Sequence, residues 1–202
     1  MTLLDRIHRD GLPYDAYRAQ WADQLTQSLK GLDKEARKYH FYRKYNAERT
    51  AHVHAAYAPS DALRTALAGI EAPQTWLVLT EAWCGDAAFN LPVIAEAAAL
   101  SPHVALRVLL RDEHTDLIER YHTNGSHSIP KLVAFDGDGT ELFTWGPRPA
   151  EAQAQVRAIL DSGVDPALAK QQFADWTTET AAWQLVDRDL AALLAEHAPV
   201  TA

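Results

Sequence analysis

Residues 75 to 92 read Thr75-Trp-Leu-Val-Leu-Thr-Glu-Ala-Trp-Cys-Gly-Asp-Ala-Ala-Phe-Asn-Leu-Pro92 and carry the strongest structural signal in the chain. The run Thr75–Leu79 is short, apolar and continuous, which is typical of a strand buried on both faces of a sheet. A helical pattern follows from about Gly85 to Leu100. Cys84 therefore stands where a buried strand ends and a helix begins.

This position favours chemistry at the sulfur. Free backbone N–H groups and the positive end of the helix dipole point at the residue that opens a helix. Such surroundings lower the pKa of a thiol below its ordinary value of about 8.5 and favour the nucleophilic thiolate. Cys84, the single cysteine of the chain, is therefore the candidate catalytic residue. One cysteine cannot form an internal disulfide, and the absence of a disulfide framework is typical of a cytoplasmic protein.

The pattern around this stretch predicts the order of the remaining elements. Further strands are predicted over Val104–Leu110 and Lys131–Phe135, and a tight turn at Asp136–Gly139 leads into an antiparallel partner at Glu141–Trp145. Helical segments separate or follow these strands. The order predicts an α/β fold in which helices flank a mixed sheet that ends in a hairpin.

At these residues the sequence resembles the thioredoxin family. Trp83-Cys84-Gly85 is similar to the start of the family motif Trp-Cys-Gly-Pro-Cys, and Pro92 stands where thioredoxins carry the proline that kinks the same helix. Ile129-Pro130 leads into a strand, as does the cis-proline that faces the active-site sulfur in that family. Gly146 follows Pro130 by sixteen residues, again as in thioredoxins.

The resemblance covers about residues 60–162. It is strongest to a bacterial thioredoxin-like group with the motif Trp-Cys-Gly-Asp-Ala and two loops that correspond here to Thr123–Lys131 and Trp145–Pro149. The implied architecture is a thioredoxin-like mixed sheet flanked by helices, with extra helices at both ends. We expect three regions: an N-terminal helical extension over 1–58, the thioredoxin-like domain over 59–162, and C-terminal helices over 163–202 that pack on the core.

The departures from the family restrict its chemistry. The family's resolving cysteine is Ala87 here, the proline between the cysteines is Asp86, and the buried carboxylate beneath the dithiol falls at Val78. A dithiol cycle within one chain is therefore excluded. Monothiol exchange or redox sensing remains, in which Cys84 forms a mixed disulfide that an external thiol releases.

The resemblance also implies a substrate groove. In the thioredoxin fold the cis-proline exposes the backbone of the preceding residue, here Ile129, for pairing with an extended substrate by strand addition. The implied groove residues are Trp83, Gly85, Asp86, Ile129, Pro130 and Gly146. Because strand addition needs no second cysteine, a redox-inactive polypeptide-binding module is the alternative function. An ordinary rigid turn at Pro130 also remains open.

Two further side chains are candidate partners of the thiolate or of an anion. Arg148 follows Gly146 in a loop that the fold places beside the cis-proline, where it either holds a carboxylate, stabilises the thiolate, or pairs with an acidic surface residue. His127 precedes Pro130 by three residues and is either a base or a solvent-facing loop histidine. Asp86 suits the helix dipole but repels a thiolate, so its net effect on Cys84 is left open.

Composition excludes several classes of protein. The net charge of −8 argues against broad nucleic-acid binding, and we interpret the basic stretch Lys34–Lys44 as a solvated helix face. No apolar window approaches the roughly 20 residues that a membrane helix needs, and the first residues do not resemble a signal peptide. His52 and His54 do not share a helix face.

We therefore expect no metal and no cofactor. An iron–sulfur cluster held by Cys84 and an external thiol is a weaker alternative, because the surrounding residues are thioredoxin-like. The expected partner is a low-molecular-weight thiol, a protein disulfide or a polypeptide.

Overall fold

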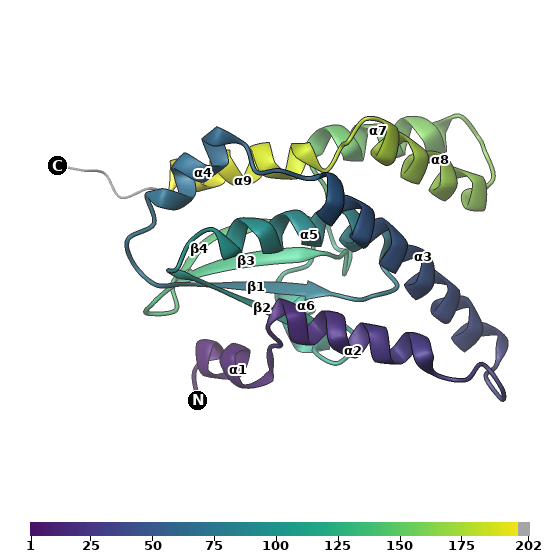
Figure 1. Ribbon diagram of the computed structural model, residues 1–202, viewed down its shortest axis with the longest axis horizontal. Coiled ribbons are helices and arrows are strands. Elements are labelled where there is room, and N and C mark those ends of the chain that lie inside the picture. Colours follow the sequence, from purple (N-terminus) through teal and green to yellow (C-terminus); the bar gives the residue numbers. More distant parts are fainter. Residues whose placement is uncertain (198–202) are drawn as a thin grey trace.

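A four-stranded sheet forms the centre of the computed structural model, which describes residues 1–197 (Figure 1). The strands are β1 (Gln74–Thr80), β2 (Val104–Leu110), β3 (Lys131–Asp136) and β4 (Glu141–Trp145), in the order β2-β1-β3-β4. β1 and β2 are parallel, whereas β3 is antiparallel to both β1 and β4. The predicted mixed sheet, with its antiparallel hairpin at one end, is confirmed.

Helices cover both faces of the sheet. They are α1 (Leu3–Asp10), α2 (Tyr14–Thr26), α3 (Lys34–Ala56), α4 (Asp61–Ala68), α5 (Gly85–Ala99), α6 (Thr115–Arg120), α7 (Ala150–Asp161), α8 (Pro166–Glu179) and α9 (Gln184–Glu196). Figure 1 shows α5 across one face, with α4 and α9 further out on that side and α1 on the opposite side. Two apolar clusters result, one on each face of the sheet.

Strand β1 supplies side chains to both clusters. Trp76 and Val78 face the cluster that contains α5, while Leu77 and Leu79 face the cluster that contains α1 and α6. Side chains alternate between the two faces of a strand, so a strand covered on both faces is apolar at every position. Burial of β1 on both faces thus explains the continuous apolar run at Thr75–Leu79, as predicted.

The N-terminal helices are fastened to the sheet and to α5. Leu12, between α1 and α2, exchanges two backbone hydrogen bonds with Val108 of β2, at 2.9 and 2.8 Å. On α3, the hydroxyl of Thr50 donates to the carbonyl of Ala88 at 3.1 Å, and the amide of Asn46 donates to the carbonyl of Ala82 at 3.0 Å. These bonds hold the connection between α1 and α2 on β2, and they hold α3 beside the beginning of α5.

The last helix packs on the same core. α9 lies against α4 and α5, and its buried Asp187 accepts hydrogen bonds from the hydroxyl of Tyr57 at 2.7 Å and from the backbone of Ser60 at 3.0 Å. These bonds join α9 to the segment between α3 and α4. Across residues 1–197, none of the helices is both long enough and apolar enough to cross a bilayer.

Candidate functional site

Cys84 occupies the N-cap position of α5, directly after the loop that follows β1. Its Sγ donates a hydrogen bond to the carbonyl oxygen of Ile129 at 3.3 Å. The Ile129–Pro130 peptide bond is cis, as the resemblance implies. The structure thus places the sulfur of the single cysteine beside Ile129, the residue that precedes the cis-proline.

The thiol is nevertheless buried, with 8% of Cys84 exposed. Burial is the largest cause that raises the pKa of Cys84 to about 12, and the charge of Asp86 acts in the same direction. The backbone N–H groups of Ala87 and Asp86 and the charge of Arg148 lower this pKa, but more weakly. The N-terminus of the helix thus lowers the pKa of the thiol, as predicted, but desolvation outweighs this effect, so the expectation of a net pKa below the ordinary value is wrong.

Helix α2 contributes to a small void beside Cys84. Tyr17 and Trp21 of α2 line a small void together with Cys84 and Glu81, and this void leaves no room for a water molecule. The Nε1 of Trp21 is buried and has no hydrogen-bond partner among residues 1–197. Because α2 lies outside the region of the resemblance, no sequence pattern indicated that its aromatic residues would lie beside the thiol.

Glu81 supplies a buried carboxyl group at the same void. Its Oε1 accepts a hydrogen bond from the backbone of Asp112 at 3.0 Å, and burial raises its pKa. Val78, where the resemblance expects the family's carboxylate, is an apolar core residue. Glu81 lies within the motif, between the strand and Cys84, but no sequence pattern distinguishes it as a site residue.

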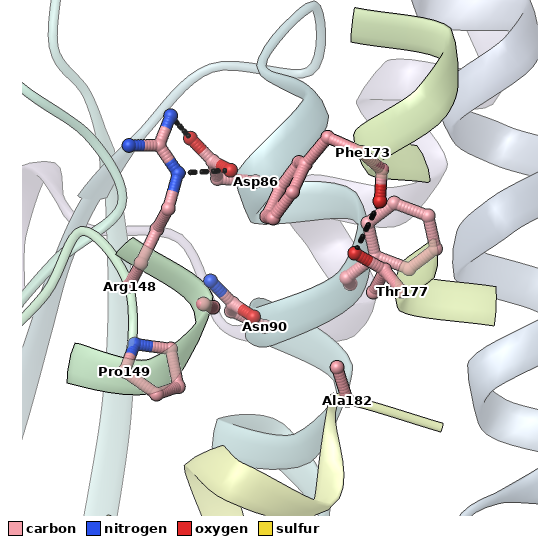
Figure 2. Close-up of a pocket in the computed structure, with 9 residues that line it drawn as sticks. Asp86, Asn90, Arg148, Pro149, Phe173, Thr177 and Ala182 are labelled. Atoms are coloured by element: carbon pink, nitrogen blue, oxygen red, sulfur yellow. Dashed lines mark hydrogen bonds and ion pairs between the residues drawn. The ribbon is translucent and has the colours of Figure 1, made fainter. Parts of the chain in front are cut away.

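Arg148 and Asp86 form a two-bond ion pair beside α5. Nε of Arg148 donates to Oδ1 of Asp86 at 2.7 Å, and Nη2 lies 2.6 Å from Oδ2. A third donor, Nη1, binds Gln153 at 2.9 Å, and the ring of Phe173 from α8 lies 5.7 Å from the guanidinium carbon. Figure 2 shows the side chain of Arg148 directed at Asp86. Of the roles left open for Arg148, the structure shows pairing with an acidic residue of the chain; that residue is Asp86 of the motif, which is largely buried and not a surface residue.

The pocket beside this pair is almost filled. Asp86, Asn90, Arg148 and Phe173 line it (Figure 2), and its volume of about 10 Å³ leaves room for about one water molecule. The amide of Asn90 donates to the carbonyl of Pro147 at 3.0 Å. The candidate site is therefore closed on this side as well as under α2.

Gly146 packs directly on the cis-proline. Its φ is +112°, and a Cβ atom at this position would lie 2.2 Å from the carbonyl oxygen of Pro130. The following bond, Gly146–Pro147, is also cis. Only glycine allows the two loops to approach so closely, so Gly146 positions Pro130.

The other predicted site residues differ in their exposure and in whether they lie beside Cys84. Ile129 and Pro130 are buried beside the sulfur, while Gly85 and Trp83 are partly exposed. The ring of Trp83 lies between Arg111, 4.8 Å away, and Tyr39 of α3, 5.5 Å away. The ring of His127 is half-exposed and bonds to Glu119 of α6, not to the thiol.

The structure offers no clustered metal ligands within residues 1–197, where no three His, Cys, Asp or Glu side chains gather. His54, one of the histidines considered from the sequence, bonds instead to the hydroxyl of Tyr14 and to the carboxylate of Glu96, both at 2.9 Å. Its two ring nitrogens are thereby occupied.

Comparisons with known proteins agree with this architecture. A family model described as thioredoxin matches residues 33–162, so the matched region begins before α3. The fold is shared with a Pseudomonas aeruginosa protein of unknown function, at 21% identity and a TM-score of 0.60, over 97% of this chain and 99% of that one. An HIV epitope scaffold has 20% identity and a TM-score of 0.56, over 95% and 97% of the chains. No curated protein matches the sequence at a significant level.

Proposed function

The chain belongs to the thioredoxin family, and we propose that it performs monothiol thiol–disulfide exchange through Cys84. The 3.3 Å contact between the Cys84 sulfur and the carbonyl of Ile129 is the observation that supports this most directly. It puts the sulfur beside the backbone with which an extended substrate would pair. Ala87 offers no second sulfur, so each mixed disulfide is released by an external thiol.

Each step of the exchange conserves the number of thiols and the number of disulfides. The Cys84 thiolate attacks one sulfur of a substrate R–S–S–R′, the S–S bond breaks, and R′–S⁻ leaves and takes up a proton. The protein then carries Cys84–S–S–R. A second thiol, R″–SH, attacks this bond as its thiolate, which regenerates Cys84 and releases R–S–S–R″. A redox sensor uses the same first step and stops at the mixed disulfide.

Exchange requires the closed site to open. Burial is the largest cause of the raised pKa of Cys84, so exposure of the sulfur to water removes that cause. The backbone N–H groups of Asp86 and Ala87 and the charge of Arg148 then favour the thiolate. Tyr17 and Trp21 line the void beside Cys84, and displacement of α2 is the opening that the proposal requires.

Two substitutions of one residue test this proposal. Trp21→Ala should open the cover and speed the alkylation of Cys84 by iodoacetamide at least about tenfold, whereas Trp21→Phe keeps the packing and should leave the rate near that of the wild type. Each protein is also incubated with cystine, a low-molecular-weight disulfide, and its intact mass is measured. We expect a mixed disulfide that dithiothreitol removes and that Cys84→Ser lacks.

Each unfavourable result has a definite meaning. Equal alkylation of the two Trp21 variants contradicts the role of α2 as the cover. Rapid alkylation of Trp21→Ala without any mixed disulfide contradicts the exchange function itself.

The raised pKa favours a second candidate, a redox-inactive module that binds a polypeptide. In the closed site the thiol stays protonated at neutral pH and donates a hydrogen bond to the carbonyl oxygen of Ile129. Such a module would leave Cys84 as a buried apolar residue. Alkylation of Trp21→Ala that still titrates well above pH 9 would favour this second function, whereas titration near or below pH 8 would favour exchange.

A further inference from the structure

Three aromatic rings, those of Trp83 in the motif and of Tyr39 and Tyr42 on α3, form a row. The ring of Trp83 lies 5.5 Å from that of Tyr39, which lies 6.4 Å from that of Tyr42. All three side chains are partly exposed. The two distances between ring centres limit the row to the length of at most about four residues of extended chain, at roughly 3.3 Å each.

Cations flank both ends of this aromatic row. The guanidinium of Arg111 lies 4.8 Å from the centre of the Trp83 ring. The amines of Lys38 on α3 and Lys170 on α8 lie 5.6 and 5.5 Å from the centre of the Tyr42 ring. Among residues 1–197, neither lysine has a carboxylate partner. Two exposed positive charges therefore converge on one ring without being neutralised.

The same part of α3 is basic in an acidic protein. Residues 34–45 contain five basic residues and one acidic residue, a net charge of +4, although the whole chain carries −8. On the outer side of this segment Phe41 and Tyr45 are 49% and 57% exposed. A positively charged, aromatic segment thus belongs to a protein whose overall net charge is negative.

We propose that the aromatic row from Trp83 to Tyr42 is a docking surface for an acidic polypeptide segment in extended conformation. Its apolar side chains would lie on the three rings, and its carboxylates would pair with Lys38 and Lys170. The negative charge of the rest of the chain disfavours a polyphosphate backbone, which requires a broad positive surface. This inference goes beyond the proposed function, since the surface binds whether or not Cys84 exchanges disulfides.

The experiment measures binding without any exchange. Cys84→Ser protein is titrated into a fluorescein-labelled eight-residue peptide that alternates Glu with Leu and Phe, and the fluorescence anisotropy is recorded. We expect saturable binding that weakens with salt. The double variant Lys38→Glu/Lys170→Glu should weaken binding at least about tenfold.

A matched control separates local from overall charge. Lys30→Glu/Arg157→Glu produces the same change in net charge at exposed residues of the described chain that lie off the row, and it should leave the affinity within about twofold. Tyr39→Leu, which removes the central ring, should also weaken binding. Equal losses in the two double variants would overturn the proposal.

Other occupants give other results. The proposal is overturned if a dT oligonucleotide of equal charge competes better than the peptide. It is also overturned if sedimentation shows that the wild-type chain self-associates and the Lys38/Lys170 variant does not, because a second copy is then the occupant. The proposed function can fail independently, since all binding measurements use a protein without the thiol.

Discussion

Arg148 binds both carboxylate oxygens of Asp86, at 2.7 and 2.6 Å, and this pair lies next to the only sulfur that can react. The two charges act on Cys84 in opposite directions: Asp86 raises the pKa of the thiol, while Arg148 lowers it. Burial of Asp86 raises the pKa of its own carboxyl group, and Arg148 counteracts this. The effects of these two charges on the pKa of Cys84 therefore partly cancel. Burial remains the main cause that determines whether the thiol ionises.

Breaking this pair from either end should move the thiol's pKa in opposite directions. Asp86→Asn removes the negative charge and keeps Arg148, so the pKa of Cys84 should fall and alkylation at pH 8 should become faster. Arg148→Met leaves Asp86 unopposed, so the pKa should rise and alkylation should slow. The pH profile of iodoacetamide labelling, followed by intact mass, measures both. If the two variants shift in the same direction, altered packing rather than charge controls the thiol.

The buried thiol should also make the folded protein less stable in alkaline solution. Burial raises the pKa of Cys84 to about 12, so between roughly pH 8.5 and 12 the unfolded chain loses a proton that the folded chain keeps. The free energy of unfolding then falls as pH rises. At pH 9.5 this loss amounts to about 1 kcal/mol, and it is absent below the ordinary thiol pKa.

Urea unfolding of the wild type and of Cys84→Ala at pH 7.5 and pH 9.5 measures this loss. The wild type should lose about 1 kcal/mol more than the variant between the two values. Burial also raises the pKa of Tyr14 and Tyr17, but these groups are common to both proteins and cancel in the difference. Equal losses in the two proteins would show that the thiol is open to solvent in the folded state.

The sequence was sufficient to predict features that depend on neighbouring residues. The apolar run at Thr75–Leu79, the turn at Asp136–Gly139 and the strand–Cys84–helix junction each follow from a local pattern. The cis bond before Pro130 was implied by the thioredoxin resemblance and is present. The first three features share one cause, since the pattern of neighbouring residues indicates them; the cis bond was expected from the resemblance alone.

The state of the sulfur could not be predicted, because distant residues determine it. Trp21 and Tyr17 lie more than sixty positions before Cys84, on a helix outside the resembling region. A local view includes the helix N-terminus, which lowers the pKa, but not the aromatic cover that raises it. The partner of Arg148 could not be predicted for the same reason. Asp86 is distant from Arg148 in the sequence and lies beside it only in the folded chain.

Gly146 should tolerate no side chain. Gly146→Ala would put a Cβ atom 2.2 Å from the Pro130 carbonyl, at a φ of +112°, and we expect a loss of at least about 3 kcal/mol in the free energy of unfolding. Gly163→Ala is the control, because Gly163 also has a positive φ, +76°, but no atom lies within 4 Å of a Cβ there. It should cost only about 1–2 kcal/mol. Similar losses in denaturant unfolding would contradict the close approach of Gly146 to Pro130.

Asp187 should be essential for holding α9 on the core. It is buried and accepts hydrogen bonds from Tyr57 and from the backbone of Ser60. Asp187→Asn keeps the shape of the side chain but removes its charge and one of its acceptor atoms, so a buried donor loses its partner and the free energy of unfolding should fall by about 2 kcal/mol. Arg188→Ala, one residue away on the exposed side and paired with Glu151, should change it by less than about 1 kcal/mol.

A single urea transition shifted to lower concentration would show that α9 unfolds together with the sheet, because the bonds of Asp187 join α9 to the segment between α3 and α4. A separate early transition, or an unchanged midpoint, would contradict that coupling.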